Sequence, residues 1–456
     1  MDSADFTVRY GQSWCFYGDG RSGIDDFLTC LAVGVAAAPA GAAFQPPEKP
    51  RVISFAAQQE IYEEELRGDD SDFLDYPDPG RLARDFLPPD KLDDPLIDRL
   101  AFREALGRGF RELSSGQNRK LLLLMALLGS SRFLVVDCPF DGLDRDSCQD
   151  VDAALQAVAG DNRLLFILVR NRQDIRCWSD YLAIFDGGKL VFHGAMAAGL
   201  ARLHEMGAAS GASSHLFTGA LADEERTGGG EELICLRNGF AYYENKPLFS
   251  GLDLTINSGD HTLITGPNGC GKSTLVQMIC GDHPKCYVND LTIFGRRRGS
   301  GESIWELKKD MGIVSPELHR TYRAPGSALQ AVLSGLYDSI GLYSKPGGEE
   351  LRRARFWLRQ VALEDKAATA FRRLHYGQQR LILIARSLVK LPKLLLLDEP
   401  TQGLDQAART GLLNFLESLA EKESGPTILY ISHREDEYRP FFRQRLRLED
   451  YRGAVS

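Results

Sequence analysis

The sequence predicts an α/β fold in two tandem copies, and three observations indicate it. A glycine-rich loop, "GPNGCGKST" at residues 266–274, has the pattern that wraps phosphate groups. An apolar run that ends in aspartate occurs in each half, "FLVVD" at 133–137 and "LLLLD" at 394–398. The leucine of a short motif, "LSSGQ" (Leu113) or "LHYGQ" (Leu374), precedes that aspartate by 24 residues in both halves. An internal repeat with one fixed spacing indicates two domains of the same design.

The length of the chain agrees with two domains. Its 456 residues, of which 43% are hydrophobic and 26% charged, suffice for two cores of ordinary size. We expect a degenerate first domain at residues 1–208 and an intact second domain at 231–456. Residues 209–230 between them are rich in Gly, Ser and Ala, which predicts a flexible linker.

Composition limits where the chain can act. The longest apolar runs, such as residues 121–129, are far shorter than the roughly 20 residues that span a bilayer, so we expect no intrinsic membrane segment. The N-terminus has neither the basic start nor the apolar core of a secretory signal. Nine cysteines without a CxxC pair argue against disulfides and a zinc site, and indicate a cytoplasmic location.

The net charge of −9 is unevenly distributed. Residues 1–208 carry 22 basic and 33 acidic side chains, whereas residues 231–456 carry 31 basic and 27 acidic ones. Most of the acidic excess lies at residues 60–98, which we interpret as a solvated, partly irregular surface insertion that would repel nucleic acid. Three adjacent arginines in residues 294–301 could bind phosphates, although a solvated or interface loop is the alternative.

The loop in the second half has the context that phosphate binding requires. It follows a strand-like segment, "HTLIT", and precedes a helix-like one, "TLVQMICG". Backbone N–H groups of such a loop turn toward phosphates, Lys272 reaches the β and γ phosphates, and Ser273 can bind Mg²⁺. The residues predicted to bind nucleotide here are Gly266, Pro267, Asn268, Gly269, Cys270, Gly271, Lys272, Ser273 and Thr274.

Three polar residues follow predicted strands of the second half. Each apolar run that ends in aspartate predicts a buried parallel strand, and ligands of open parallel sheets bind along the edge where such strands end. Asp398 at that edge can hold Mg²⁺, and Glu399 can orient or deprotonate an attacking water. His433 follows the next strand, 35 residues after Asp398. With Lys272, we predict Glu399 and His433 to be the catalytic residues.

Together these motifs resemble the ATP-binding cassette (ABC) ATPase family, whose signature is of the "LSSGQ" type and whose D-loop is of the "GLD" type. The resemblance implies the cofactors ATP and Mg²⁺ and two P-loop NTPase domains in an intrachain head-to-tail pseudo-dimer. In that arrangement Ser114 and Gly116 complete the ATP site from the other domain. It also implies that Tyr243 stacks on adenine, with Tyr242 as the alternative, and that His433 contacts the γ-phosphate.

The first half carries a damaged copy of the loop, "YGDGRSGID" at residues 17–25. Two of its residues, Ile24 and Asp25, stand where a lysine and a hydroxyl residue are needed. By the resemblance, Cys138 takes the catalytic glutamate position, Asn171 the histidine position, and His375 the serine position of the second signature. All five losses fall on one composite site, so we predict that the first domain is kept for its signature.

Residues 281–323 resemble tandem-cassette members of the family that are named for molybdate transport. This implies a cytoplasmic ATPase that energises or regulates an oxyanion (molybdate) importer through a separate permease on the membrane. The family's Q-loop glutamine is replaced by Pro316 and Glu317. The alternative is a non-transport ATPase that acts as an ATP-dependent switch on nucleic acid or a protein partner.

Overall fold

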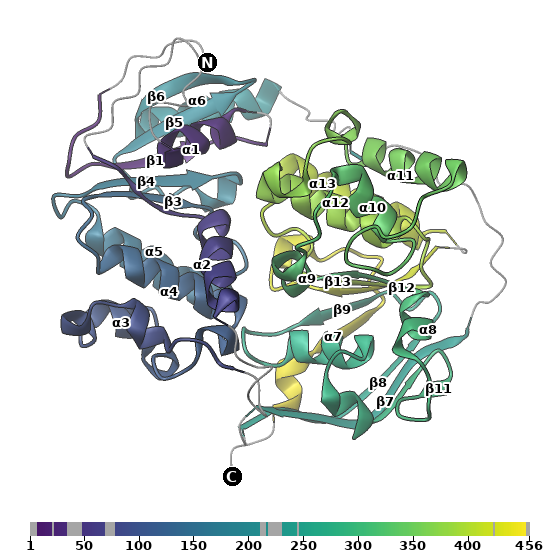
Figure 1. The fold of residues 1–456 in the computed structure, drawn as a ribbon. Coiled ribbons are helices and arrows are strands. Elements are labelled where there is room, and N and C mark those ends of the chain that lie inside the picture. The colour runs from purple at the N-terminus through teal and green to yellow at the C-terminus, as the bar shows by residue number, and fades with distance from the viewer. Residues whose placement is uncertain are drawn as a thin grey trace. The chain divides into compact units, whose positions relative to one another are not determined.

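The computed structural model describes residues 7–20, 22–33, 48–68, 78–209, 216–217, 230–243, 246–422 and 425–452. The chain divides into two compact units (Figure 1). The first unit comprises residues 1–213 with 403–407, and the second comprises residues 214–402 with 408–456.

The first unit is built on a six-stranded sheet. Five of its strands are parallel, and the sixth pairs antiparallel with the fifth. Strands β3 and β4 are buried along their whole length, as their continuous apolar sequences predict. In spatial order the strands are β2 (Arg51–Ile53), β3 (Phe133–Asp137), β4 (Leu164–Val169), β1 (Ser13–Tyr17), β5 (Tyr181–Asp186) and β6 (Lys189–Ala195).

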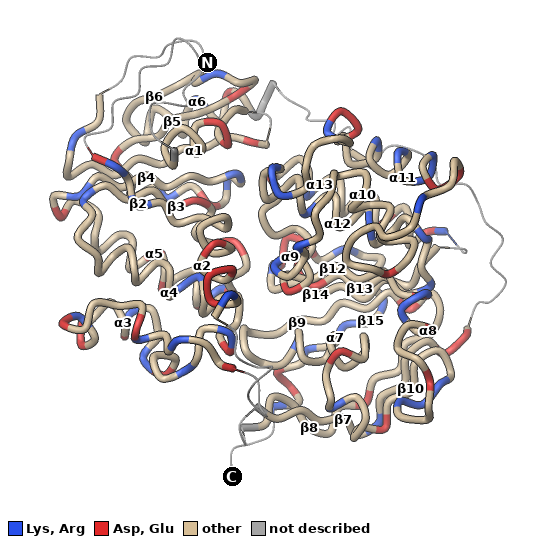
Figure 2. The backbone as a smooth tube through the Cα atoms, viewed as in Figure 1, with Lys and Arg blue, Asp and Glu red and all other residues tan. Residues whose placement is uncertain are grey.

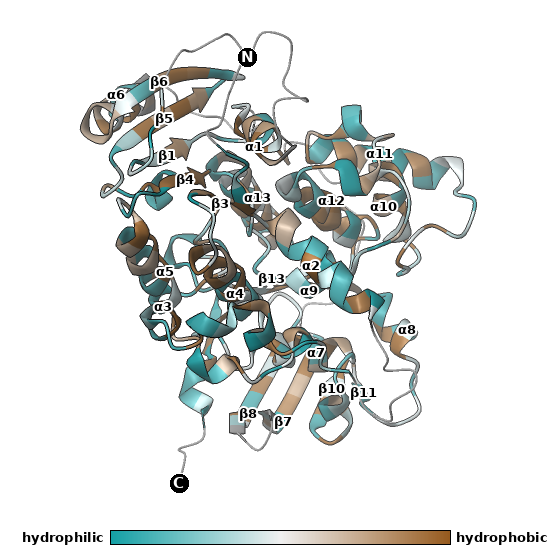
Figure 3. Cartoon of the chain, turned by 60° about the vertical axis from the view of Figure 1, so that its left-hand side comes forward, coloured by the Kyte–Doolittle hydropathy of each residue, from teal (hydrophilic) through white to brown (hydrophobic). Residues whose placement is uncertain are grey.

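Two apolar cores form around this sheet, because successive side chains of a strand point to opposite faces. In β1, Cys15 belongs to one core, whereas Trp14 and Phe16 belong to the other. The strands β1 and β4 are hydrophobic over most of their length (Figure 3). The α-helices of the unit are α1 (Ile24–Val33), α2 (Phe55–Arg67), α3 (Pro95–Arg99), α4 (Ser115–Leu127), α5 (Arg145–Val158) and α6 (Met196–Ala209).

The acidic segment at residues 60–98 is largely solvated and partly irregular where the structure describes it, as we interpreted, but it also contributes apolar residues to the core of the domain. Residues 60–67 form the end of α2, where acidic side chains gather (Figure 2). Tyr62, Leu87 and Ile97 are buried in the larger core. Glu65 is buried too, and its carboxylate accepts a 2.6 Å hydrogen bond from Arg81 Nε. Charge is therefore carried on the outer faces of elements whose inner faces complete the domain.

The second unit repeats the sheet of the first. Its parallel strands follow the same order, so that β1, β2, β3, β4 and β5 correspond to β9, β12, β13, β14 and β15. The two tandem α/β domains predicted from the repeat are thereby confirmed. In spatial order the strands are β12 (Met311–Val314), β13 (Leu394–Asp398), β14 (Thr427–Ile431), β9 (Thr262–Thr265) and β15 (Gln444–Arg447).

The second unit has a further, antiparallel sheet. It contains β11 (Arg296–Arg297), β10 (Asp290–Ile293), β7 (Glu232–Tyr243) and β8 (Lys246–Asn257). The described part of the first unit has no counterpart of it. The α-helices of the second unit are α7 (Lys272–Cys280), α8 (Ile304–Lys308), α9 (Pro316–Thr321), α10 (Ala328–Ser334), α11 (Gly348–Gln360), α12 (Tyr376–Leu388) and α13 (Gln406–Ala420).

Most of the expected linker at residues 209–230 lies outside the described residues. Phe217 within it is described and is buried in the second unit. Its backbone N–H donates a 2.5 Å hydrogen bond to the Gln360 carbonyl, and its ring stacks on Phe415 with centroids 4.6 Å apart. Thus at least one residue of this segment packs against a domain.

Across the described ranges, none of the helices combines the length and the apolar character needed to cross a bilayer.

Candidate nucleotide site

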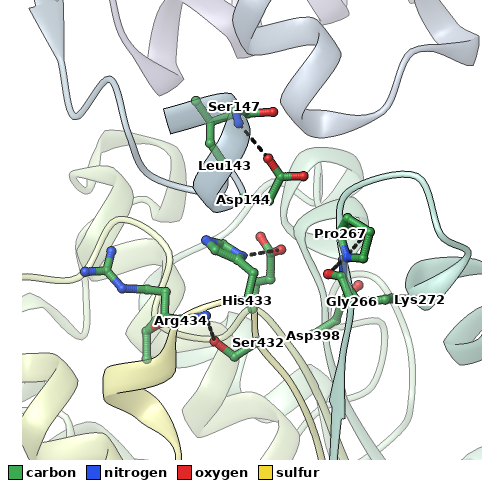
Figure 4. A network of polar contacts seen from close by, with 12 residues as sticks. Leu143, Asp144, Ser147, Gly266, Pro267, Lys272, Asp398, Ser432, His433 and Arg434 are labelled. Carbon is green, nitrogen blue, oxygen red and sulfur yellow. Dashed lines mark hydrogen bonds and ion pairs between the residues drawn. The ribbon is translucent and has the colours of Figure 1, made fainter. Parts of the chain in front are cut away.

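The glycine-rich loop of the second unit joins β9 to α7, as its sequence context predicts. Gly266 and Gly271 have φ angles of 148° and 98°, a region that residues with a Cβ rarely adopt. A Cβ on Gly266 would also lie 2.7 Å from Cys270 Sγ. Lys272, the first residue of α7, is buried, and its Nζ donates to the carbonyls of Gly266 at 2.8 Å and Pro267 at 2.9 Å (Figure 4). The loop thus folds around its own lysine.

The other predicted residues of the loop differ in exposure. Gly269 is exposed with a φ of 78°, while Pro267 and Asn268 are half-buried. In the first turn of α7, Ser273 is exposed and Thr274 is half-buried. Cys270 is buried, and burial raises the pKa of its thiol, so it packs as a neutral side chain.

Asp398 lies at the end of β13, where the sheet brings it to the loop. Ser273 Oγ donates a 3.1 Å hydrogen bond to Asp398 Oδ2. Burial, together with the adjacent Glu399 carboxylate, raises the pKa of Asp398 to about 7. A hydroxyl and a carboxylate side by side are the oxygen ligands that Mg²⁺ prefers, and bound Mg²⁺ favours the ionised carboxylate. These two residues therefore fit the predicted metal.

The raised pKa of Asp398 gives a prediction for the protein without nucleotide or Mg²⁺. Ionising this buried group costs folding free energy, and the cost grows as pH rises from about 4, the unfolded pKa, to about 7. We therefore expect Asp398→Asn to raise stability, on the order of 2–4 kcal/mol at pH 8 and less at pH 5. Thermal unfolding at both pH values measures it.

The matched control is Asp137→Asn in the first unit. Asp137 holds the equivalent strand end but has an arginine partner, Arg170, at 2.5 Å. We expect this change to lower stability, because it removes one side of a buried ion pair. Stabilisation by both changes would show that burial alone decides the effect.

Glu399 and His433 form a pair at the same edge of the sheet. His433 Nδ1 lies 3.1 Å from Glu399 Oε1, and Figure 4 shows the His433 ring among the loop and strand ends. The backbone of Glu399 has a φ of 46°, an unfavourable angle that persists only where its surroundings impose it. Its other oxygen, Oε2, is buried and accepts no hydrogen bond from the described residues. One carboxylate oxygen is therefore held while the other is available.

The charge of Glu399 is favoured by its neighbours. Burial alone would raise the pKa of this carboxyl, but the hydrogen bond with His433 and the positive charges of Lys272 and Arg380 bring it below its ordinary value. Asp398 and Glu399, although adjacent, thus have pKa values displaced in opposite directions. Glu399 is therefore the one of the two carboxyl groups that is ionised at neutral pH, as a group that accepts a proton from water must be.

Sequence reasoning missed the arginine that supports this edge. Arg380 on α12 is fully buried and donates to the carbonyls of Asp398 at 2.8 Å and Glu399 at 2.6 Å. In the first unit, Arg119 on α4 donates to the carbonyls of Asp137 and Cys138 in the same way. The arginine stands two residues after the glutamine of each short motif. Its repetition at one position in both halves was the signal that could have identified it.

The two short motifs begin helices of equal length. Ser114 caps α4, and its Oγ accepts a 3.2 Å hydrogen bond from the Gln117 backbone N–H. Ser114 is exposed and Gly116 is buried. His375 takes the cap position of α12, where Gln378 Oε1 accepts a 3.3 Å hydrogen bond from the His375 backbone N–H. Ser114 and Gly116 lie in the first unit, apart in the chain from the loop that they are predicted to complete.

The first unit preserves the shape of the site without its chemistry. Ile24 at the lysine position is fully buried in an apolar core. Cys138 has a φ of 46°, the same as Glu399, which confirms that the two positions correspond. Burial raises the pKa of the Cys138 thiol well above its usual value, so this group is neutral and is no substitute for a carboxylate.

Strand register corrects one predicted position. Asp137 pairs with Leu168 in the first unit, and Asp398 pairs with Ile431 in the second. The residue two beyond Ile431 is His433, whereas the residue two beyond Leu168 is Arg170. The histidine position is therefore filled by Arg170, and our assignment of Asn171 was wrong by one residue.

Arg170 occupies the centre of the damaged site. Its guanidinium lies 2.5 Å from Asp25 Oδ1, 2.5 Å from Asp137 Oδ1 and 2.5 Å from Cys138 Sγ. Burial would lower the pKa of Arg170, but the carboxylates of Asp137 and Asp25 raise it well above its usual value. The first unit thus supplies its own cation to the two carboxylates at the positions of Ser273 and Asp398.

Two further predicted features are the adenine-stacking tyrosine and the Q-loop position. Tyr243 ends β7, but its side chain lies outside the described part of the structure, and Tyr242 is exposed. The choice between them for adenine stacking stays a prediction. At the Q-loop position, Glu317 accepts a hydrogen bond from Gln277 on α7, the helix that follows the loop.

The arginine-rich loop is internally paired. Arg298 is buried and pairs with Glu302 at 2.6 Å. Arg296 pairs with Glu306, and Arg297 lies 3.4 Å from Asp290. All three charges are therefore engaged within the second unit.

Comparisons with known proteins agree with this geometry. The family model described as ABC transporter matches residues 249–402. The ABC transporter ATP-binding protein ModF of Escherichia coli (strain K12) is 34% identical over 455 residues, covering 94% of this chain and 90% of ModF. An uncharacterized ABC transporter ATP-binding protein of Schizosaccharomyces pombe is 28% identical over 71% of this chain and 66% of its own length.

Solved structures support the fold over both units. A chain in the complex of the archaeal ribosomal stalk protein aP1 and the archaeal ribosome recycling factor aABCE1 covers 94% of this chain, with a TM-score of 0.52 and 16% identity; 81% of that chain is matched. A structure of RNase-L Inhibitor has the same coverage, with a TM-score of 0.51 and 17% identity. At such identities the likeness concerns the fold alone.

Proposed function

The chain belongs to the ABC transporter family of ATP-binding proteins, and from this premise we propose that it hydrolyses ATP at one composite site. Family membership makes it an ATP-binding ATPase. In our proposal the loop of the second unit (266–274) holds the phosphates, and Ser114 and Gly116 of the first unit complete the site across a head-to-tail pseudo-dimer. The damaged first loop takes no part in hydrolysis.

The observation that carries this proposal is the contrast at the two sheet edges. In the second unit, Glu399 is ionised, hydrogen bonded to His433, and has one buried oxygen without a donor among the described residues. In the first unit, the neutral Cys138 lies against the paired Arg170. Of these two equivalent positions, Glu399 offers a carboxylate that can accept a proton from water, and Cys138 does not.

The residues of the second unit have distinct roles in the proposal. Lys272 binds phosphate oxygens, and its present carbonyl partners are weaker acceptors than phosphates. Glu399 Oε2 accepts the proton of the attacking water, while His433 holds Oε1 and contacts the γ-phosphate. Mg²⁺, held by Ser273 and Asp398, would neutralise charge that develops on the phosphates.

The proposal predicts different results for matched changes in the two halves. Lys272→Ala should abolish hydrolysis, and Ser114→Ala should lower kcat about 10- to 100-fold, because it removes a hydroxyl donor to a charged oxygen. Asp25→Ala, at the position of Ser273, and His375→Ala, at the position of Ser114, alter the damaged site and should leave turnover unchanged. Steady-state ATPase assays on folded variants test this, and equal losses from Ser114→Ala and His375→Ala would contradict a single composite site.

For the biological role, we propose a cytoplasmic subunit that energises or regulates an oxyanion importer, such as one for molybdate, through a separate permease. The supporting observation is the similarity to ModF over 94% of the chain. The replaced Q-loop glutamine, with Glu317 bonded to Gln277, indicates coupling that differs from the family pattern. The alternative is a switch on nucleic acid, for which the arginines of residues 296–298 are the candidate phosphate contacts: Arg298 is buried with Glu302, and Arg296 and Arg297 form exposed surface pairs.

Fractionation distinguishes these roles. Binding to membranes only when a molybdate-type permease is co-expressed would support the importer role. Retention on immobilised nucleic acid in the presence of ATP, without membrane association, would instead support the switch.

A further inference from the structure

A carboxylate outside the predicted site is buried directly behind it. Glu437 ends a short 3₁₀ segment, Glu435–Glu437, that follows His433. It is 1% exposed and accepts three hydrogen bonds, from Thr401 Oγ1 at 2.5 Å, Ser432 Oγ at 2.7 Å and Tyr430 Oη at 2.9 Å. Arg409 Nη1 lies 3.8 Å from it.

The donors come from the two segments that carry Glu399 and His433. Thr401 stands two residues after Glu399, and Ser432 immediately precedes His433, whose place in the site is seen in Figure 4. One carboxylate therefore bridges the two loops, with one oxygen bonded to each: Oε1 to Thr401 and Oε2 to Ser432. The orientation of His433 toward Glu399 depends on how these loops are held.

Burying a carboxylate costs folding free energy unless its oxygens are fully hydrogen bonded. The three donors to Glu437 offset this cost. Burial, followed by the charge of Glu437, raises the pKa of Tyr430 well above its usual value. Tyr430 is therefore a neutral donor at physiological pH. The network of Glu437 with Tyr430, Ser432, Thr401 and Arg409 is here called the Glu437 network.

The first unit provides an internal comparison, because it has the same strand order. Strand register and the shared motif spacing assign to the four partners of Glu437 the residues Ile167, Val169, Phe140 and Cys148. None of these carries a hydroxyl or a positive charge. The Glu437 position is Asp174, which is only half-buried and accepts a 3.3 Å hydrogen bond from Asn171.

The parallel sheet folds with or without the Glu437 network. The first unit forms the same parallel sheet with apolar side chains in place of the Glu437 network. The network is therefore not required by the fold. It is present in the unit that retains Lys272, Glu399 and His433, and its counterpart is lost in the unit that lacks all three.

We propose that Glu437 is a positioning residue for ATP hydrolysis, which fixes the His433 loop against the Glu399 loop through Ser432 and Thr401. This inference rests on the proposed function, in which Glu399 and His433 act at one site. Glu437 contacts neither nucleotide nor water in this role, so its loss should reduce kcat while leaving ATP binding, which depends on the loop at 266–274, almost unchanged.

Two variants test the role, with controls for each. Glu437→Gln keeps the size of the side chain but removes its charge, and Thr401→Val keeps the shape but removes one donor. We expect each to lower kcat about 10- to 100-fold with KM for ATP within about twofold, the size of loss that a small misplacement of catalytic groups causes. Thr401→Ser, which restores the hydroxyl, should retain turnover, and Asp174→Asn, the matched change in the first unit, should have no effect.

A double-mutant cycle distinguishes positioning from a general loss of structure. In a His433→Ala background, Glu437→Gln should lower the residual kcat by less than about twofold, because the group that it positions is gone. An unchanged kcat in Glu437→Gln, or a loss that multiplies fully with that of His433→Ala, would overturn the inference. If His433→Ala alone retained full turnover, the proposed function itself would fail.

Discussion

In a Glu399→Gln variant, ATP hydrolysis should fall by about 10²- to 10⁴-fold, and one ATP should remain bound per chain. The amide cannot accept a proton from water, and general-base groups contribute about this factor. The P-loop residues, including Lys272, are unchanged, so nucleotide still binds. Rapid filtration with labelled ATP, followed by counting of nucleotide per chain, measures the trapped amount.

The corresponding change in the first unit is the control. Cys138→Ala should keep normal turnover, because a buried neutral thiol contributes nothing to proton transfer. Two trapped ATP molecules in Glu399→Gln would mean that the loop at residues 17–25 binds nucleotide without its lysine. The first unit would then contain a regulatory nucleotide site, in addition to supplying the signature motif with Ser114 and Gly116.

The parts of the structure that could be predicted are those fixed by local pattern. Buried parallel strands have continuous apolar sequences, so β3 and β13 were identified from five residues each. The glycine loop was recognisable because its backbone angles require glycine at set positions. The repeat added the correspondence between the two halves.

The predictions were wrong or incomplete where strand register or core packing, and not the local sequence, decides the position of a residue. The histidine position was assigned by finding an Asn at a strand end, but the register of β3 with β4 places Arg170 there. The separation of Arg170 from Asp137 is two residues shorter than that of His433 from Asp398. Sequence spacing alone therefore could not align Arg170 with His433. The contribution of the acidic segment to the core was missed because a count of charges does not show that Tyr62 and Ile97 face a core.

Glu437 shows a further limit. It is the last of three consecutive acidic residues in the sequence "HREDEY", and acidic residues are mostly exposed. Nothing local distinguishes the one that is 1% exposed from Glu435 and Asp436. Its donors lie up to 36 residues away, and only the packing of β14, the Thr401 loop and α13 brings them together.

The Arg170 contacts explain how the first unit tolerates two carboxylates at a phosphate site. Arg170 and Asp137 are each 9% exposed at the side chain, so neither charge is well hydrated. In the second unit, the equivalent Asp398 is partly neutralised by its raised pKa. In the first unit, the Arg170 guanidinium is always charged and balances the carboxylates of Asp25 and Asp137. The stability of this unit should therefore not depend on Mg²⁺ or nucleotide.

Arg170→Ala should therefore lower the free energy of unfolding of the first unit by about 3–5 kcal/mol, since it leaves Asp25 and Asp137 without their cation. Urea denaturation measures this loss. Adding Asp25→Asn and Asp137→Asn to the same chain should recover most of it, because no unpaired charge then remains. Below the unfolding transition, turnover should be unchanged and trapping should stay at one ATP. A second trapped ATP in Arg170→Ala would show instead that the arginine excludes nucleotide from a competent site.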